Sequence, residues 1–384
     1  MLLTPARIAN QLRCWMNYAL SLFGIVHISH YPTFLTIEPS NICQLACPQC
    51  PVGMAKKHTH GGAVSRPHPI GDTTEGASAL PHPLNKEGMR GRGITNSASP
   101  FPDYPLSLLA DCFRYAHTIQ FYFQGEPLLN PRLPELIHEA AQQGLYTIVS
   151  TNAQSLNREM ARRLITSGLH RIIISMDGLS QASYEAYRQG GSVEKTKAAL
   201  RYLREEREIA RRQRLISGDY PIIELQCLLL RSNEPEQSLM RKTYRLLGAD
   251  RLTFKTAQFY DYQYGNPLMP TRDQDRRYQQ CADGTYRIKR SPLRRLWQTL
   301  TGISPCYRLW AGCVLTTGGD VLPCCYDKSH THAYGNIHTV PLATIFRSKK
   351  AKDFRRQVIL APSRQKSGLA TATLPPEICQ NCWH

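Results

Sequence analysis

The stretch "SNICQLACPQCP", Ser40–Pro51, places Cys43, Cys47 and Cys50 within eight residues. It directly follows an apolar run, residues 33–39, whose pattern predicts the first strand of an α/β fold. Such folds place their chemistry on the loops at the carboxyl ends of the strands. Soft thiolates suit iron–sulfur clusters, whereas a tetrahedral zinc site would need a fourth ligand nearby. The stretch therefore predicts an iron–sulfur site, with three packed thiols as the alternative.

The pattern that follows this loop is regular. Mostly apolar runs predict five further strands, at residues 118–123, 145–151, 171–175, 222–230 and 251–255. Amphipathic helical patterns separate these runs, and several of them stop at glycine, as helices often do. Apolar strands that alternate with amphipathic helices indicate parallel βαβ units. We therefore predict an α/β fold, a partial (β/α)6 TIM-like barrel, although a doubly wound sheet fits the periodicity nearly as well.

Composition divides the rest of the chain. Residues 1–32 predict an N-terminal amphipathic helix rather than a signal or membrane anchor, because no apolar run is long enough to span a bilayer. The barrel is expected over residues 33–258. Residues 55–102, rich in Gly, Pro, Ser, Thr and His, predict a disordered insertion. Residues 259–384 are loop-rich and contain seven cysteines, which indicates a small Cys-rich C-terminal domain.

The net charge and the distribution of cysteines indicate the kind of partner and the cellular compartment. The chain has 13 cysteines, an odd number concentrated toward its two ends, and this distribution favours reduced thiols or metal ligands in the cytoplasm. Its formal net charge of +18 suits an acidic partner, such as nucleic acid, an anionic membrane surface or an acidic peptide. Solvated basic helix faces are the alternative explanation for the two basic runs at residues 287–295 and 347–356.

The spacing CxxxCxxC after a first strand resembles the signature of the radical S-adenosylmethionine (SAM) superfamily. The resemblance implies that Cys43, Cys47 and Cys50 hold a 4Fe-4S cluster whose open iron binds SAM. It further implies cleavage of SAM to a 5′-deoxyadenosyl radical, which abstracts hydrogen from a substrate. Gln49 departs from the pattern, since the residue before the third cysteine is often aromatic in this superfamily.

Motifs after the later strands also resemble those of this superfamily, and they occur in the order in which the superfamily has them. "QGEP" after the second strand is similar to its GGEP motif, "STNA" and "SMDG" close the third and fourth strands, and "YEAYRQGG" follows. The resemblance implies SAM-binding roles for Gln124, Gly125, Glu126, Asn152, Ser175, Asp177 and Arg188. The alternatives are turn capping by Asn152 and Asp177, and a surface ion pair for Arg188.

The C-terminal cysteines resemble the SPASM extension of radical SAM enzymes. Cys306 is followed by twelve residues, Gly319, four residues and Cys324, and the chain closes with a CxxC pair. The resemblance implies one auxiliary 4Fe-4S cluster, held by Cys306, Cys324, Cys379 and Cys382. Cys325 is an alternative to Cys324, Cys313 is expected to pack on a strand, and a four-cysteine zinc site is the competing interpretation.

These features together predict a radical SAM enzyme that acts on a peptide or protein side chain and is reduced by a flavodoxin or ferredoxin. Asp261, in the linker "FYDYQYGNP", is a predicted catalytic residue that would take up a proton. One alternative is radical SAM modification of RNA or of a small metabolite. Another is a non-catalytic iron–sulfur or zinc protein that binds nucleic acid.

Overall fold

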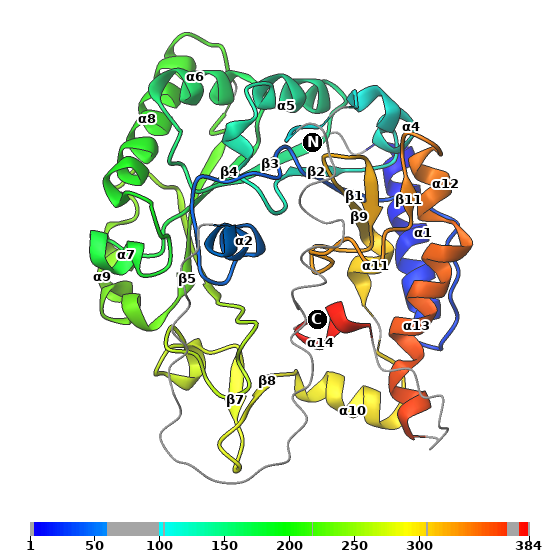
Figure 1. The fold of residues 1–384 in the computed structure, drawn as a ribbon. Helices are drawn as coiled ribbons and strands as arrows, with labels where there is room; N and C mark the ends of the chain where they lie inside the picture. Colours follow the sequence, from blue (N-terminus) through cyan, green and yellow to red (C-terminus); the bar gives the residue numbers. More distant parts are fainter. Residues whose placement is uncertain are drawn as a thin grey trace.

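A nine-stranded sheet organises the protein, and its strand order is β11-β10-β9-β1-β2-β3-β4-β5-β6 (Figure 1). The computed structural model describes residues 4–59, 100–102, 104–216, 218–304, 306–366 and 376–382. Six strands are parallel to their neighbours and consecutive along the chain. They are β1 (Phe34–Ile37), β2 (Thr118–Phe121), β3 (Tyr146–Thr151), β4 (Arg171–Ser175), β5 (Ile222–Leu229) and β6 (Arg251–Thr256). The six predicted strands and the α/β class are thus confirmed.

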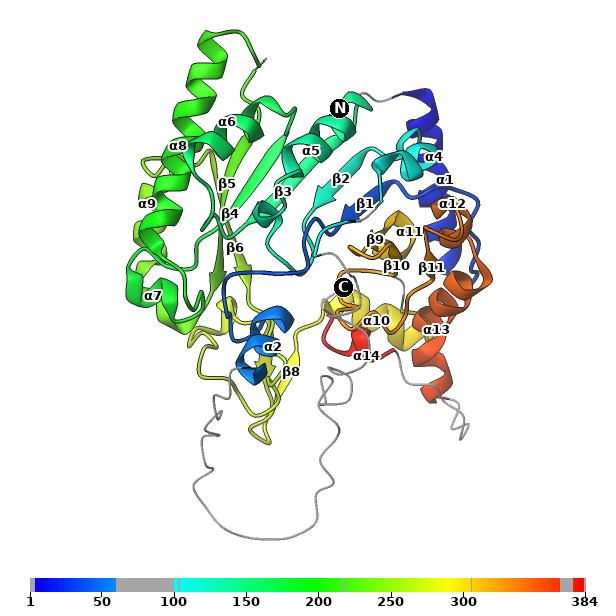
Figure 2. The same ribbon diagram turned by 45° about the horizontal axis from the view of Figure 1, so that its top comes forward.

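Helices cover the outer face of this curved sheet, as both views show (Figures 1 and 2). The connections contain η1 (Leu106–Leu109), α4 (Ala110–Phe113), η2 (Pro127–Leu129), α5 (Leu133–Gln142), α6 (Arg158–Thr166), α7 (Gln181–Glu185), α8 (Val193–Arg212), η3 (Arg231–Glu236) and α9 (Gln237–Thr243). Local sequence sets their ends. The Asn157 side chain accepts from the N–H of Met160 at the start of α6. Gly144 and Gly168, both with positive φ, follow α5 and α6.

The two faces of the sheet differ in character because side chains alternate along each strand. Leu35, Phe121 and Ile174 belong to the hydrophobic core beneath the helices. The intervening residues face the inner side and are largely polar: Thr36, Gln120, Tyr122, Ser150, Ser175, Glu224, Gln226, Thr253 and Lys255. The inner face is therefore equipped for polar contacts at the carboxyl ends of the strands.

The C-terminal region continues the same sheet. Strand β9 (Gly312–Leu315) pairs in parallel with β1, and β10 (Asp320–Leu322) and β11 (Gly335–Asn336) add antiparallel strands beyond it. Gly312 permits this pairing, because a Cβ there would lie 2.1 Å from the carbonyl oxygen of Phe34. The expected domain boundary after residue 258 therefore does not coincide with a break in the sheet.

The remaining C-terminal elements surround these strands. A separate two-stranded sheet joins β7 (Tyr278–Gln280) to β8 (Tyr286–Ile288). The helices are η4 (Asp273–Asp275), α10 (Pro292–Thr301), α11 (Tyr307–Ala311), α12 (Leu342–Phe346), α13 (Lys349–Lys366) and α14 (Glu377–Gln380).

Two helices belong to the N-terminal part. Helix α1 (Pro5–Ser21) confirms the predicted N-terminal helix, and α2 (Pro51–Thr59) begins directly after the third cysteine of the loop. Residues 55–59, expected to open a disordered insertion, are helical, because Pro51 suits a first helical position and Ala and Lys continue it. The insertion's residues 60–99 lie outside the described part. No helix among the described residues has the length and apolar character needed to cross a bilayer.

Candidate active site

The loop after β1 carries the three motif cysteines. Cys47 is buried, whereas Cys43 and Cys50 are half-buried. The N–H of Cys50 donates to the carbonyl of Cys47 over 3.2 Å, which closes the turn from which α2 begins. The N–H of Ala46 donates to the carbonyl of Gln189, so the segment after α7 fixes the middle of the loop. The sequence places the three cysteines on one loop at the carboxyl end of β1, with Cys47 and Cys50 at the two ends of its turn.

The environment of these thiols disfavours bare thiolates. Burial, together with the charges of Glu126 and the other two cysteines, raises the pKa of Cys43 to about 12, against the lowering effect of the Leu45 N–H. Burial also raises the pKa of Cys47 to about 11, against the lowering effect of Arg188. Thiolate is the form that binds metal. Iron must therefore displace the protons and supply most of the compensating positive charge.

The donor set fits a cluster better than a single ion. In a 4Fe-4S cluster each cysteine binds a different iron, so the thiols need not meet at one point. Zinc requires four donors at about 2.0–2.3 Å from one centre. The loop thus offers the three separate thiolates that a cluster with one open iron would use.

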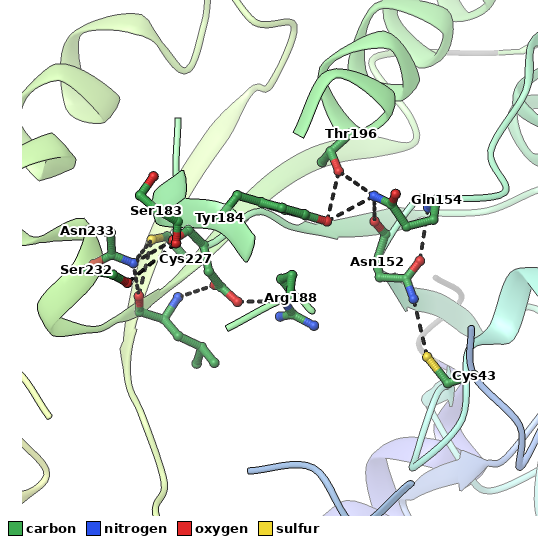
Figure 3. Close-up of polar contacts among 12 residues, drawn as sticks. Cys43, Asn152, Gln154, Ser183, Tyr184, Arg188, Thr196, Cys227, Ser232 and Asn233 are labelled. Atoms are coloured by element: carbon green, nitrogen blue, oxygen red, sulfur yellow. Dashed lines mark hydrogen bonds and ion pairs between the residues drawn. The ribbon is translucent and has the colours of Figure 1, made fainter. Parts of the chain in front are cut away.

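Asn152, at the end of β3, contacts the cysteine loop (Figure 3). Its Nδ2 lies 3.5 Å from Cys43 Sγ, and its Oδ1 accepts from the side chain of Gln44 and from the N–H of Gln154. The Gln154 amide continues the contacts to the hydroxyl groups of Tyr184 and Thr196. The polar end of β3 therefore lies against the loop, where the predicted SAM site would be.

Glu126 is buried, and donors surround its carboxylate. Oε1 accepts from the N–H of Leu128 and from the hydroxyl of Thr151, and Oε2 accepts from the N–H of Asn152 over 2.8 Å. Burial raises the pKa of Glu126, and these hydrogen bonds oppose that effect. A carboxylate has about four acceptor positions, so three are already used. Glu126 joins the ends of β2 and β3, and the predicted contact with the SAM ammonium would share its last position.

Gly125 is required by close packing. A Cβ at this position would lie 2.0 Å from the carbonyl oxygen of Ser40 and 2.7 Å from that of Ile42. The next N–H, that of Glu126, donates to the carbonyl of Ile42 over 2.7 Å. The "QGEP" turn is therefore docked, backbone to backbone, on the segment that leads into Cys43.

Asp177 and Arg188 form a buried ion pair, with Oδ2 and Nε 2.6 Å apart. The other Asp177 oxygen accepts from the N–H of Leu228 over 2.7 Å. Burial alone would lower the pKa of Arg188, but Asp177 and Cys47 hold it well above its usual value. The sequence alternative of a surface ion pair is wrong, because Asp177 is fully buried and the Arg188 side chain is only 16% exposed.

Replacing Arg188 with methionine is expected to destabilise the protein by about 3–5 kcal/mol, because it leaves a buried carboxylate without its partner. It should also lower cluster loading, since Arg188 is the cation beside Cys47. Thermal unfolding under anaerobic conditions and the iron content measure both effects. The control is Arg163→Met, which breaks an exposed pair with Glu135 and should cost less than about 1 kcal/mol. Equal effects of the two variants would contradict the importance of the buried pair.

Three other sequence-predicted residues have different surroundings. Ser175 is buried at the end of β4, beside the inner face. The Gln124 side chain donates to the carbonyl of Lys328 over 2.8 Å, which connects the end of β2 to the loop after β10. Asp261 is exposed and accepts from the Asn266 side chain in its own loop. The structure therefore places Ser175 and Gln124 at the inner end of the sheet and directs Asp261 into a local turn.

Gln49 has a role that sequence analysis missed. Its side-chain oxygen accepts from the N–H of Tyr260 over 2.9 Å, so the residue that departs from the motif joins the cysteine loop to the linker after β6. Burial raises the pKa of Tyr260, and the charges of Cys50 and Cys325 raise it further, which places the phenol near both cysteine-bearing regions. The only sequence signal for this contact was that Gln49, directly before the third motif cysteine, departs from the often aromatic residue of the superfamily.

The C-terminal cysteines form a second group. Cys306 precedes α11, Cys324 follows β10, and Cys379 and Cys382 lie on and just after α14. Burial raises the pKa of Cys324, and the charges of Cys325, Cys306 and Cys379 raise it further. In contrast, the Cys325 thiol lies 3.2 Å from Arg308 Nη1. Cys324 and Cys325 therefore both lie beside this group, and Cys325 also contacts Arg308. Cys313 is buried in β9, on a strand as predicted.

Comparison with known proteins gives two matches within the chain. Residues 37–209 match the radical SAM superfamily, and residues 306–383 match the SPASM iron–sulfur cluster-binding domain. The AdoMet-dependent heme synthase of Nitratidesulfovibrio vulgaris is 24% identical over 341 residues, 83% of this chain and 80% of that protein. The PqqA peptide cyclase of Granulibacter bethesdensis is 27% identical over 161 residues, 41% of this chain and 39% of that protein.

One solved structure extends the likeness over nearly the whole chain. Streptococcus suis SuiB bound to its precursor peptide SuiA has a TM-score of 0.54 and 12% identity, and the match covers 97% of this chain and 80% of SuiB. At this identity the match shows a shared fold. The fold and the two matched regions thus agree with the positions of the two cysteine groups.

Proposed function

Since the chain is a radical SAM enzyme with a C-terminal SPASM domain, we propose that it abstracts a hydrogen atom from a substrate held at the inner face of the sheet. When bound, the cluster and SAM supply the 5′-deoxyadenosyl radical for this step. The observation that carries the proposal is the turn at the end of β1, where three thiols lie beside Asn152 and Arg188.

The side chains around this turn are proposed to hold SAM. In this proposal Asn152, Ser175 and Arg188 contact the cofactor. The hydrogen bond of Glu126 with the N–H of Asn152, that of Asp177 with the N–H of Leu228, and the Asp177–Arg188 ion pair support it, because they fix the strand ends. Gln124 and Gly125 belong to the turn that docks on the cysteine loop. The seven proposed SAM-binding residues are Gln124, Gly125, Glu126, Asn152, Ser175, Asp177 and Arg188. A catalytic role for Asp261 stays a prediction.

The substrate is proposed to be a peptide or protein that carries acidic groups. Lys255 faces the inner side from β6 and has no carboxylate partner among the described residues, whereas Arg171 is paired with Glu224. Burial lowers the pKa of Lys255, the charge of Glu224 opposes that effect, and the charges of Arg171 and Arg308 add to it, so a further anionic group would stabilise the charged lysine. The fold of SuiB and the PqqA cyclase relative support a peptide.

A small acidic molecule is the second candidate. The relative that supports it is the heme synthase, which aligns with 83% of this chain, about twice the share that the peptide cyclase covers. The same unpaired lysine would serve a carboxylate from either source.

The C-terminal cysteines are proposed to hold one auxiliary 4Fe-4S cluster through Cys306, Cys324, Cys379 and Cys382, all within the matched SPASM region. We infer that a flavodoxin or ferredoxin supplies the reducing electron and that the enzyme works in the reducing cytoplasm. The odd number of cysteines, concentrated toward the two ends of the chain, supports such a compartment.

The direct test uses anaerobically reconstituted protein. We expect about eight irons and a similar amount of sulfide per chain, and 5′-deoxyadenosine after addition of dithionite and SAM. Iron and sulfide analysis and chromatography measure these outcomes. About four irons together with SAM cleavage would contradict the auxiliary cluster, and a fully loaded protein that never cleaves SAM would contradict the proposed reaction.

A further inference from the structure

Helix α1 turns its polar face toward the core, whereas an amphipathic surface helix usually turns its apolar face inward. The residues that it buries are mainly polar: Arg7, Asn10, Cys14, Asn17 and Ser21. Four large apolar side chains face outward, each between 47% and 55% exposed: Ile8, Leu12, Trp15 and Met16. A surface helix normally turns its apolar stripe toward the core. The outward stripe of α1 therefore needs an explanation outside the core.

The buried polar face fixes this orientation. The Arg7 guanidinium donates to the carbonyls of Gly144, Gln143 and Phe113, over 2.6–3.1 Å, at the ends of α5 and α4. The Asn17 amide lies 2.8 Å from His30 Nδ1, whose ring contacts the carbonyl of Trp310 through Nε2. Rotating the apolar stripe inward would break these buried hydrogen bonds, and unpaired buried polar groups are costly. The stripe is thus held outward by the fold.

The apolar surface continues beyond α1. Phe23 is 73% exposed and Ile25 is 52% exposed on the turn that follows the helix. A Cβ at Gly24, between them, would lie 3.5 Å from Leu360 Cδ2 on α13 and 3.8 Å from Ile303 Cδ1 after α10. Helix α10 also exposes three leucines, Leu293, Leu296 and Leu300. Helices α1 and α13 lie along the same edge of the protein in both views (Figures 1 and 2). The turn after α1 therefore points toward the segment that follows α10, and both α1 and α10 carry exposed apolar residues.

The charge of this side is positive. The first 37 residues contain no Asp or Glu. The run at residues 287–295, which leads into α10, has five basic residues and no acidic one. The run at residues 347–356, which leads into and starts α13, has six basic residues, of which Arg355 is fully buried, and one acidic residue. Outward apolar side chains between basic segments are the pattern of a helix that lies in a bilayer interface.

We propose that α1, its following turn and α10 bind the surface of an anionic membrane, with the apolar side chains inserted at the headgroup level. The apolar side chains proposed to insert are Ile8, Leu12, Trp15, Met16, Phe23, Ile25, Leu293, Leu296 and Leu300. A lipid surface accounts for the apolar stripe and for the basic runs beside it, whereas a water-exposed role would account for neither. The assignment is independent of the reaction proposed above.

The test is cosedimentation of the cluster-loaded protein with vesicles. We expect binding to phosphatidylcholine vesicles that contain about one third phosphatidylglycerol, weaker binding in high salt, and little binding to phosphatidylcholine alone. The double variant Leu12→Ser/Phe23→Ser should bind at least about tenfold more weakly. The matched control is Leu239→Ser/Leu246→Ser, which changes two leucines that are 54% and 79% exposed on and after α9. The control should bind within about twofold of the wild type.

Each opposite result overturns the proposal. Absence of binding by the wild type does so, as does an equal loss in both double variants. Equal binding to neutral vesicles overturns the choice of an anionic surface. Self-association of the wild type in the absence of lipid, measured by light scattering and abolished by Leu12→Ser/Phe23→Ser, would assign the face to a protein contact instead. Iron content and melting temperature of the variants report whether they are folded.

Discussion

Replacing Cys47 with alanine is expected to abolish 5′-deoxyadenosine formation and to remove about four irons per chain. Cys47 is the buried member of the three-cysteine turn, and its thiol lies beside Arg188. Without it, only two of the three loop thiolates would be left to hold the cluster. Iron and sulfide analysis, followed by chromatography after reduction with dithionite, measures the loss.

The matched control for this substitution is Cys281→Ala. Cys281 follows β7 in the two-stranded sheet, outside both cysteine groups, and its backbone N–H donates to the carbonyl of Thr285, a contact that alanine keeps. The control should retain the iron content and activity of the wild type. Full iron content and undiminished SAM cleavage in Cys47→Ala would show that the turn does not hold the cluster.

Gly125→Ala is expected to have the largest structural effect of any single methyl addition near the site. The new Cβ would lie 2.0 Å from the carbonyl oxygen of Ser40. Both residues belong to backbone segments that neighbouring strands hold in place. We expect a loss of about 3 kcal/mol or more in the free energy of unfolding. Because Ser40 leads into the cysteine loop, cluster loading should fall with stability. Anaerobic thermal unfolding and iron analysis would measure both.

Gly218→Ala serves as its control. Gly218 has φ of +69°, and a Cβ there would meet nothing within 4 Å, so alanine brings backbone strain without overlap. Its cost should be about 1 kcal/mol, with full iron content. A Gly125→Ala protein as stable as this control would mean that the "QGEP" turn can move away from the loop.

Sequence patterns could predict the strands and the first cysteine group because both depend only on residues that are close together in the sequence. β4 begins at Arg171 and ends at Ser175, as predicted, since a short apolar run between two turns leaves little freedom. The pairing of β9 with β1 could not be predicted, because it joins residues almost 280 positions apart through backbone hydrogen bonds that carry no sequence signature. The same applies to Gln49, whose partner Tyr260 is distant in sequence.

Side-chain roles were harder to predict than side-chain positions. Glu126 and Asp177 could be placed at strand ends from the motif order, but the number of donors around each depends on neighbouring strands. The amphipathic pattern of α1 predicted a helix without revealing which face is buried. Only Arg7, a cation among apolar residues, hinted that the polar face packs inward. The alternation of Glu224 and Lys255 along apolar strands was a readable sign of a polar inner face.

Strand β1 is central in the sheet, with β2 on one side and β9 on the other. It has only four residues, and the cysteine turn extends from its end. Without the C-terminal region, β1 would become an edge strand with an unpaired row of N–H and C=O groups, which other chains can recruit into aggregates. Strand β9 follows all six parallel strands in the sequence, so the support of the first cysteine loop is completed only after those strands have been made. Before β9 pairs with it, β1 would present an open edge that stray strands could recruit.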